Sequence, residues 1–537
     1  MKVPLTPIRC LLWAAAQYGT KVGVVDGERR FTYAQVLDRA SRLAAALKHL
    51  GAERGDRVAT LSFNCHHLLE AYYGVPMARC VLLSLNVRLT PEEQTYILRH
   101  SGTKIILFDP EFLPVAAALH AELSGLQWVA LEAPRDMPEW VHPRPYQRLL
   151  EEAAPEPIDY TTYVEDEIAE LFYTSGSTGM PKGVMLSHRT LYLHALGTLL
   201  GTLRIARATP ADRIIEGHTI PLFHANGWGR AHTVTLAGGR HVMIKRFDPQ
   251  FVCELIQREK ITTISMVPTM ANALIHFPGL GQYDLSSLQE VNLGGAASSQ
   301  SLVQAVEQKL GCPTYVGYGL TETSPVATAA HIKDSLQGCD EAERIRRQAM
   351  TGYPLPGVEL SVADSEGRDV PKDMQAIGEI LIRGDLVMDG YWNEPEATAA
   401  AVENNWLHTG DMAVWDELNY ALIVDRKKDI IISGGENISS IEIEKVIAAH
   451  PAVYEAAVFG VPDEKWGEVP KAVVVLKPGI SLSADELREH VRSHLAGFKL
   501  PKSIEFRAEL PKGSTGKILK RVLREPYWAA MEKRVQG

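Results

Sequence analysis

The sequence has few cysteines and no arrangement of them that would bind a metal. Six occur in 537 residues, and they are scattered without any Cys-x-x-Cys pair. This spacing argues against a disulfide framework and against a zinc site built on paired thiolates. We therefore expect reduced thiols and a cytoplasmic location.

Long hydrophobic runs and an excess of positive charge are also missing. No apolar stretch approaches the length of a membrane span. The apolar run at residues 10–16 follows two basic residues but is too short for a signal peptide, so we predict a first surface helix there. The formal net charge of −10 leaves no overall basic surface for nucleic acid or an anionic membrane.

What is present is the composition of a globular protein in which strands and helices alternate. Hydrophobic residues make up 46% and charged residues 22% of a chain long enough for two or more domains. Thr32-x-x-Gln35 has the form of a capping box, and Gly51 suits the end of the helix that follows. Three strands are predicted, at residues 57–61, 81–85 and 104–108. Such alternation is typical of parallel sheets covered by helices.

Two later regions complete this pattern. Residues 134–157 are rich in proline and lack periodicity, which predicts a surface connection between subdomains. Alternation then resumes, with strands predicted at 261–267 and 291–293 and a helix at 302–310. Ser439-x-x-Glu442 predicts a capped helix that opens a smaller C-terminal unit. That unit continues with predicted strands 456–460 and 472–476 and a helix 484–495.

Residues 173–183 combine the residue types that hold a polyphosphate. Three glycines, four aliphatic hydroxyl residues and Lys182 fall within eleven positions. Glycines let backbone N–H groups point at an anion, hydroxyls add donors, and the lysine adds charge. The stretch has neither the order of the usual P-loop nor that of a nucleophile elbow. On composition alone, a flexible turn is the alternative.

Five motifs resemble the signatures of one family and occur in that family's order. They lie at residues 173–183, 318–323, 406–411, 425–437 and 511–517. On these motifs the chain resembles the adenylate-forming, or AMP-binding, superfamily, and within it the acyl-CoA synthetase branch. The motifs span nearly the whole chain, so the agreement is far more specific than a match to one loop.

The resemblance implies an α/β fold with two domains. A large N-terminal domain of several subdomains is expected at residues 1–425, and a small mobile α+β domain at residues 426–537. The hinge is expected near Lys428, where the backbone must absorb a rotation without losing packing. The compositional unit near the C-terminus begins in the same place.

The resemblance also implies a reaction that uses ATP, Mg²⁺ and coenzyme A. ATP activates a carboxylic acid as an acyl adenylate, and the thiol of CoA then takes the acyl group. Lys517 is the expected catalytic residue, reaching the carboxylate and the α-phosphate. Glu322 is the expected magnesium ligand, with Thr178 on the phosphate side, because a hard cation prefers oxygen ligands. Ordinary surface positions for Lys517 and Glu322 are the structural alternatives.

Residues that hold the nucleotide follow from the same resemblance. Tyr318 would stack on adenine, with the turn at Gly295 and Ala296 near the ring edge. Asp411 would accept hydrogen bonds from the ribose hydroxyls, supported by Arg426, although such a pair can also be a structural ion pair. The remaining expected contacts are Thr174, Ser175, Gly176, Ser177, Thr178, Gly179, Lys182, Gly317, Gly319 and Thr321.

The acyl and CoA sites complete the assignment. His224 would lie near the substrate carboxylate, although a lone histidine in an apolar stretch is as often structural. Trp228 would wall or gate the acyl channel, or belong to the core. No aspartate occurs in residues 221–229 to bind an α-ammonium group. Gly434 and Gly435 would line the tunnel for the slim thiol arm of CoA.

These features predict an ATP-dependent acid–CoA ligase for a medium- or long-chain fatty acid. Its partners would be small molecules and not nucleic acid, and a homodimer is compatible with it. A short, substituted or aromatic acid is the alternative substrate. A stand-alone adenylation enzyme serving a carrier protein and a non-catalytic nucleotide-binding protein are the alternative functions. The presence of Lys517, Glu322 and Asp411 together argues against lost catalysis.

Overall fold

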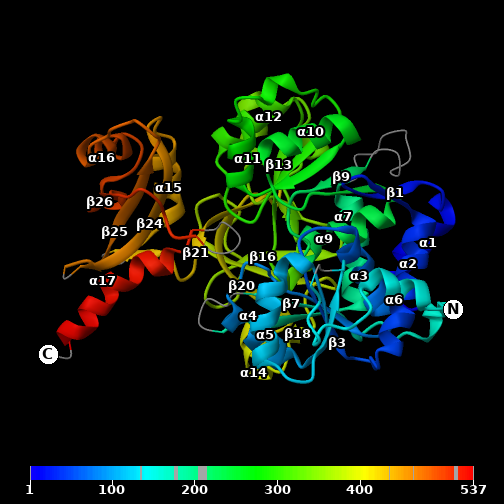
Figure 1. The fold of residues 1–537 in the computed structure, drawn as a ribbon. Coiled ribbons are helices and arrows are strands. Elements are labelled where there is room, and N and C mark those ends of the chain that lie inside the picture. Colours follow the sequence, from blue (N-terminus) through cyan, green and yellow to red (C-terminus); the bar gives the residue numbers. More distant parts are fainter. Residues whose placement is uncertain are drawn as a thin grey trace.

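The computed structural model describes residues 2–133, 136–174, 180–202, 214–433, 436–463, 465–512 and 518–535. The chain forms a large N-terminal α/β domain and a smaller C-terminal domain, which lies to one side in Figure 1. In the described part of the chain, no helix is both long enough and apolar enough to cross a membrane.

The first sheet of the large domain contains seven described strands and is mostly parallel. In spatial order they are β18 (Gly390–Tyr391), β8 (Lys182–Ser187), β7 (Ile168–Thr174), β4 (Val81–Ser84), β3 (Arg57–Leu61), β5 (Thr103–Phe108) and β6 (Gln127–Ala130). Helices α4 (Pro91–Ser101) and α5 (Leu113–Glu122) cover one face, and α2 (Tyr33–His49) and α3 (His66–Met77) cover the other. This is the covered parallel sheet that the alternation predicts.

A second sheet has nine described strands and is called here the nine-stranded sheet. Its order is β15 (Tyr353–Pro354), β14 (Thr328–Ala329), β13 (Thr314–Tyr318), β12 (Glu290–Leu293), β11 (Thr263–Met266), β9 (Ile215–His218), β10 (Arg240–Met243), β1 (Val22–Asp26) and β2 (Arg29–Thr32). Helices α10 (Pro249–Glu259), α11 (Pro268–Ile275) and α12 (Gln300–Leu310) pack on one face through an apolar cluster. Helix α9 (Ala225–Leu236), which packs on α7 (His188–Thr202), lies on the other side.

One antiparallel and one mixed sheet complete the molecule. The first joins β16 (Val358–Ala363), β17 (Gly378–Gly384), β20 (Trp406–Trp415), β19 (Val402–Glu403) and β21 (Ala421–Arg426). The second belongs to the C-terminal domain and joins β23 (Glu436–Ile438), β22 (Ile431–Ser433), β25 (Gly467–Leu476), β24 (Val453–Asp463) and β26 (Ser503–Phe506). Helices α15 (Ser440–Ala448), α16 (Ala484–Arg492) and α17 (Lys520–Val535) pack on this second sheet.

Local sequence signals with a direct chemical cause are confirmed. The capping box at Thr32 and Gln35 forms with both of its hydrogen bonds, and Ser439 caps α15 by accepting from the N–H of Glu442. Strand β3 covers the same residues as predicted. The first helix, α1 (Ile8–Tyr18), is also present, but it is less of a surface helix than expected because one of its faces is fully buried.

The prediction of a plain surface connection at residues 134–157 is wrong in part. This segment contains helix α6 (Tyr146–Glu152), which packs against α2. Tyr146 is fully buried, and its hydroxyl donates to Glu70 at 2.8 Å. The prolines mark the turns around this helix correctly, but seven residues are too few for a periodicity to be visible in the sequence.

Candidate active site

The candidate site lies at the carboxyl ends of the parallel strands of the nine-stranded sheet. Strand β12 runs directly into Gly294 and Gly295, and β13 ends at Tyr318. Gly295 has a φ of +74°, a conformation that glycine adopts without strain, and it is exposed together with Ala296. Ligands of open α/β sheets bind at such strand ends, so the fold brings the predicted adenine side to a favourable place.

Tyr318, Asp411 and Arg426 form one hydrogen-bonded group. The Tyr318 hydroxyl donates to Asp411 Oδ2 at 2.8 Å, and Arg426 Nε lies 2.6 Å from Asp411 Oδ1. Asp411 on β20 and Arg426 on β21 are direct partners across the two strands, and Asp411 is only 2% exposed. Burial and the Asp411 charge hold the pKa of Tyr318 well above its usual value, so the ring stays neutral. Three residues predicted to hold the nucleotide are thus brought together.

Glu322 and Lys182 meet through a residue that the sequence reasoning missed. The Tyr391 hydroxyl donates to Glu322 Oε1 at 2.9 Å, and Lys182 Nζ lies 5.0 Å from the centre of the Tyr391 ring. Strand β18, which carries Tyr391, pairs with β8, which begins at Lys182. The pairing places the predicted metal ligand beside the predicted phosphate-binding lysine. A tyrosine outside every motif gave no signal in the sequence.

The predicted phosphate loop connects two paired strands. Thr174 at the end of β7 lies opposite Lys182 at the start of β8, so the two ends of the predicted loop are paired across adjacent strands. Ser175, Gly176, Ser177, Thr178 and Gly179 lie outside the described residues.

The glycines next to Tyr318 differ in what their missing side chains allow. A Cβ at Gly319 would lie 1.8 Å from the carbonyl oxygen of Pro325, so the backbone itself requires glycine there. A Cβ at Gly317 would meet only the Thr328 carbonyl, at 3.7 Å, which leaves room beside it. Close packing therefore requires glycine at position 319, whereas Gly317 borders open space. Thr321 begins the short 3₁₀ turn that carries Glu322 and is half-buried.

His224 stands immediately before α9. Its Nε2 is buried and has no hydrogen-bond partner among the described residues. Burial, aided by the positive charge of Arg88, lowers the pKa of His224 to about 4, so the imidazole is neutral at pH 7. A buried polar atom without a partner is uncommon in a protein interior and marks a place where a ligand can bind.

Comparison with known proteins identifies the family. Residues 11–392 match the family described as AMP-binding enzyme, and residues 442–517 match the AMP-binding enzyme C-terminal domain. The chain belongs to the AMP-binding enzyme family. The resemblance stated from the five motifs is confirmed.

Relatives of this AMP-binding enzyme align over nearly its whole length. The long-chain-fatty-acid–CoA ligase of Thermus thermophilus is 41% identical over 521 residues, which are 96% of this chain and 94% of the relative. The peroxisomal butyrate–CoA ligase of Arabidopsis thaliana is 36% identical over 97% of this chain and 93% of its own. The crystal structure of the anthranilate CoA ligase AuaEII in complex with anthranoyl-AMP matches with a TM-score of 0.87, at 26% identity and 99% coverage of both chains.

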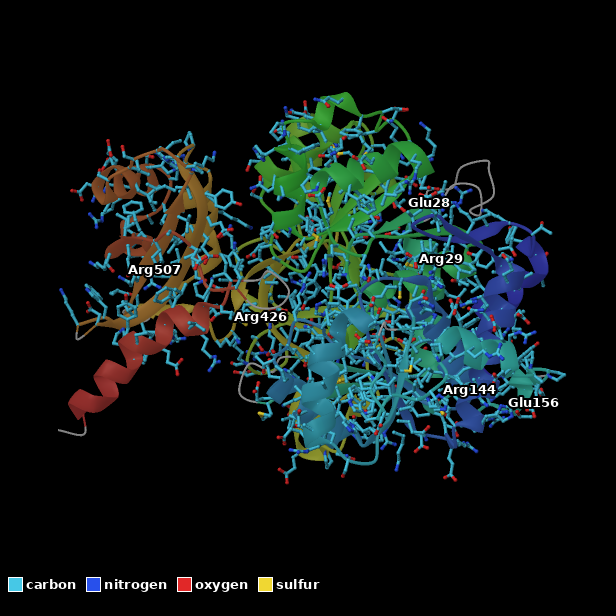
Figure 2. All side chains as sticks on the ribbon, viewed as in Figure 1. Glu28, Arg29, Arg144, Glu156, Arg426 and Arg507 are labelled. Carbon is cyan, nitrogen blue, oxygen red and sulfur yellow. The ribbon has the colours of Figure 1, made fainter. Side chains whose placement is uncertain are left out.

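The boundary between the two domains of this AMP-binding enzyme is held by a buried polar cluster. Asp425 at the end of β21 is 1% exposed and accepts from the backbone N–H of Ser440, at the start of α15. Lys520 Nζ donates to the Ser440 hydroxyl at 2.6 Å and lies 2.8 Å from Glu444 Oε1. Figure 1 shows α15 beside β21, and Figure 2 labels Arg426 at the same junction.

Lys428, the predicted hinge, follows this cluster on an exposed turn. Its backbone carbonyl accepts from Arg524 Nη1 at 3.0 Å, so α17 also contacts the turn. Gly434, Gly435 and Lys517 lie outside the described residues. The proposed hinge is thus flanked by contacts that have to change if the C-terminal domain rotates.

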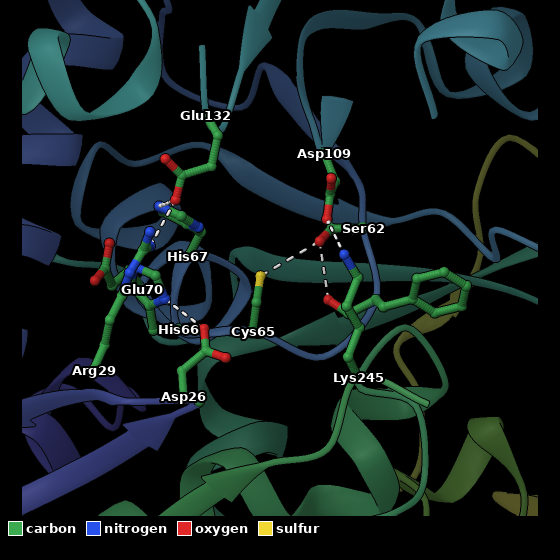
Figure 3. Close-up of polar contacts among 12 residues, drawn as sticks. Asp26, Arg29, Ser62, Cys65, His66, His67, Glu70, Asp109, Glu132 and Lys245 are labelled. Carbon is green, nitrogen blue, oxygen red and sulfur yellow. Dashed lines mark hydrogen bonds and ion pairs between the residues drawn. The ribbon is translucent and has the colours of Figure 1, made fainter. Parts of the chain in front are cut away.

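A cavity that the sequence analysis missed lies near His224. It has a volume of about 310 Å³, and three basic residues, Arg88, Lys245 and Arg246, line it together with Phe63 and Pro221. Lys245 is partly neutralised, since its Nζ lies 3.0 Å from Asp109 Oδ2, as Figure 3 shows. These basic residues come from segments about 160 residues apart, so no sequence window could have revealed the cluster.

Cys65 lies close to this cavity but is unsuited to act as a nucleophile. Its Sγ lies 3.4 Å from the Ser62 hydroxyl (Figure 3). The neighbouring His66 is engaged elsewhere, since its Nδ1 lies 2.6 Å from Asp26 Oδ2. Burial raises the pKa of the Cys65 thiol to about 12, so the reactive thiolate does not form at neutral pH.

Replacing Glu322 by glutamine should abolish most magnesium-dependent turnover and leave the fold intact. Glutamine keeps the acceptor for the Tyr391 hydroxyl but removes the charge that a hard divalent cation prefers. The rate measured against magnesium concentration checks this. Tyr391→Phe is the matched control, because it removes the hydrogen bond and keeps the carboxylate. Unchanged turnover of Glu322→Gln at limiting magnesium would contradict the assignment.

Lys428→Pro should slow thioester formation more than adenylate formation. Proline fixes its own φ and restricts the preceding residue, so a turn that needs two backbone states is held near one. Single-turnover rates of the two half-reactions check this. Lys428→Ala, which removes the ammonium group and leaves the backbone free, should affect both rates little. Equal losses in both half-reactions for Lys428→Pro would rule out a hinge at this position.

Proposed function

We propose that this AMP-binding enzyme is an acyl-CoA ligase. ATP and a carboxylic acid would form an acyl adenylate and release pyrophosphate, and the CoA thiol would then displace AMP to give the thioester. The observation that carries the proposal is the convergence of Tyr318, Asp411 and Arg426 with Glu322 and Lys182 at one edge of the nine-stranded sheet. The CoA ligases among the relatives support the same reaction.

The first step requires two anions to approach each other, so the site has to supply positive charge and donors. We assign Lys182 and the loop that precedes it to the phosphates, and Lys517 to the carboxylate and α-phosphate. Asp411 would bind the ribose hydroxyls, with Arg426 fixing the orientation of its carboxylate. The neutral imidazole of His224 would bind the substrate carboxyl group through its unpaired Nε2.

The chemistry at Glu322 fits a magnesium ion that is shared with the phosphates. Among the described residues, no group of three or more His, Cys, Asp or Glu side chains is placed to hold a metal. Mg²⁺ is commonly held by one or two carboxylates, with water and substrate phosphates as its other ligands. Bound there, the ion would neutralise phosphate charge, while the Tyr391 hydroxyl, from the strand paired with β8, would hold the Glu322 carboxylate in place.

We assign the basic cavity beside His224 to the phosphate groups of CoA. Arg88, Lys245 and Arg246 bring three positive charges against the two carboxylates of Asp109 and Glu111, and Phe63 offers an aromatic surface. Gly434 and Gly435 are proposed to line the path of the pantetheine arm toward the acyl adenylate. This arrangement would let the thiol approach from the side of the large domain that carries His224.

The acid that is activated differs among the relatives. The relatives are named for acids as different as long-chain fatty acids, butyrate and anthranilate. The sequence prediction of a medium- or long-chain fatty acid stays a prediction. A layer of polar side chains beneath α9, which includes the Arg230–Glu216 pair and two histidines, favours the alternative of a substituted acid.

Pyrophosphate release tests the reaction class. The purified protein with ATP, magnesium and a panel of carboxylic acids should release pyrophosphate, and adding CoA should convert slow single turnover into steady turnover with thioester as product. Mass measurement of the thioester identifies the acid. Cleavage of ATP to ADP and phosphate would refute adenylation. Adenylation that CoA never accelerates would instead favour a carrier protein as acceptor.

Lys517→Ala should impair one half-reaction and spare the other. Removing a preorganised contact to developing charge costs about 10²–10³ in rate, so adenylate formation should fall by that factor. Thioester formation from supplied acyl adenylate and CoA should survive, because that step is expected to use the other orientation of the C-terminal domain. Thioester appearance after adding purified acyl adenylate measures this. If a folded mutant does not convert the supplied acyl adenylate to thioester, the role of Lys517 is not confined to the first step.

A further inference from the structure

One face of the nine-stranded sheet carries polar side chains although it is buried. On β9, Ile215 faces the apolar cluster under α10–α12, while Glu216 and His218 point to the opposite side. The same alternation places the other members on that side, and the polar face is defined as Glu216, His218, His241, Thr263, Asn292 and Tyr315. Buried parallel strands are usually apolar on both faces, so this composition requires a reason.

Helix α9 covers the polar face and adds a guanidinium group to it. Arg230 donates to Glu216 Oε2 from Nη2 at 2.5 Å and from Nε at 3.1 Å, and the Thr263 hydroxyl donates to the same oxygen at 2.6 Å. Arg230 is 6% and Glu216 is 1% exposed. A guanidinium group has five N–H donors, of which two are used here, and the others have no further partner among the described residues.

The polar face carries no uncompensated positive charge. The Arg230 charge is balanced by Glu216, and Glu290 on β12 adds a second carboxylate near Tyr315. Burial lowers the pKa of His218 to about 4 and that of His241 well below its usual value, so both imidazoles are neutral at pH 7. They lie 2.9 Å apart, and the Thr235 hydroxyl of α9 lies 3.0 Å from His241.

The polar face lies next to the place proposed for the acyl group. Helix α9 starts directly after His224, and at a rise of about 1.5 Å per residue Arg230 follows some 9 Å further along its axis. Asn292 and Gly317 on the same side of the sheet are half-buried, and a Cβ at Gly317 would find room. An acyl group that enters at His224 and lies between α9 and the sheet therefore meets the polar face within two helical turns.

We propose that the acid activated by this enzyme carries a neutral hydrogen-bonding substituent, such as a hydroxyl group, which the polar face binds. Asn292 and Arg230 are the specificity-determining residues in this proposal, which rests on the function proposed above. An unsubstituted alkyl chain would displace water from the Asn292 amide and the Arg230 guanidinium without replacing the hydrogen bonds that the water makes. A second carboxylate is disfavoured, because the only guanidinium described on this face is already paired with Glu216.

Matched pairs of acids test the proposal on the full-length enzyme. Pyrophosphate release would be measured with butyrate against 4-hydroxybutyrate, and with 3-phenylpropanoate against its 4-hydroxyphenyl counterpart; octanoate and glutarate complete the panel. We expect kcat/KM for at least one hydroxylated acid to exceed that of its unsubstituted partner, of octanoate and of glutarate by about tenfold or more, since a site that binds a hydroxyl group rejects the analogue without it.

Asn292→Leu should reduce that preference by about tenfold or more, mainly by lowering kcat/KM for the hydroxylated acid. Gln289→Leu is the matched control, because Gln289 is exposed just before the same strand and this substitution also replaces a side-chain amide by an alkyl group. Thermal unfolding shows whether each variant is folded, and Asn292→Ala replaces the leucine variant if the larger side chain disturbs packing.

Two outcomes would overturn the inference in different ways. If unsubstituted acids are preferred over their hydroxylated partners, or if folded Asn292 variants keep the wild-type preference, the polar face does not select the substrate and the ligase function still stands. If no acid in the panel supports pyrophosphate release while ATP is cleaved to ADP, the proposed function itself fails, and the inference that rests on it fails as well.

Discussion

The buried carboxylate of Asp411 is the group on which the arrangement of the site depends. A carboxylate that is almost fully removed from water is costly unless it is paired and hydrogen-bonded. Here Tyr318 donates to one oxygen and Arg426 contacts the other. Tyr318 ends a strand of the nine-stranded sheet, whereas Asp411 and Arg426 belong to the antiparallel sheet beside it. One carboxylate thus joins two sheets at the point where the large domain ends.

On the phosphate side of the site, a tyrosine hydroxyl again donates to a carboxylate, here at the edge of the seven-stranded sheet. Tyr391 on β18 links the turn that carries Glu322 to the strand that begins with Lys182. Residues proposed to contact adenine, ribose, metal and phosphate therefore come from three sheets that are joined by side-chain hydrogen bonds. Because each joining group is a tyrosine, the bonds are made by neutral rings whose bodies are also packed, which limits their movement.

The two faces of the nine-stranded sheet have different roles: one stabilises the fold, and the other is the face proposed to select the substrate. The face under α10, α11 and α12 is a continuous apolar cluster, and burying it from water stabilises the fold. The face under α9 holds a paired guanidinium and carboxylate with two neutral imidazoles, and such networks gain little stability when they are satisfied. A sheet that forgoes apolar packing on one side gains a surface that can discriminate between ligands.

Much of this molecule could be predicted from short stretches of sequence, because their causes are local. A capping box and a strand bounded by turns depend on neighbouring residues, and Thr32 with Gln35 behaves as its spacing predicts. The five motifs likewise indicated the family without a structure. Helix α6 was not predicted, because it is short and its stability comes from Tyr146 packing against residues distant in the sequence.

Only the tertiary structure decided which distant side chains meet. Strand order brings Glu216 under Arg230, and the pairing of β18 with β8 brings Tyr391 to Glu322 and Lys182. The reason is geometric: alternation along a strand tells which residues share a face, but the partner across that face depends on how sheets and helices stack. The sequence by itself determined the residue chemistry and the family, and the stacking of α9 on the sheet decided what surrounds the proposed acyl site.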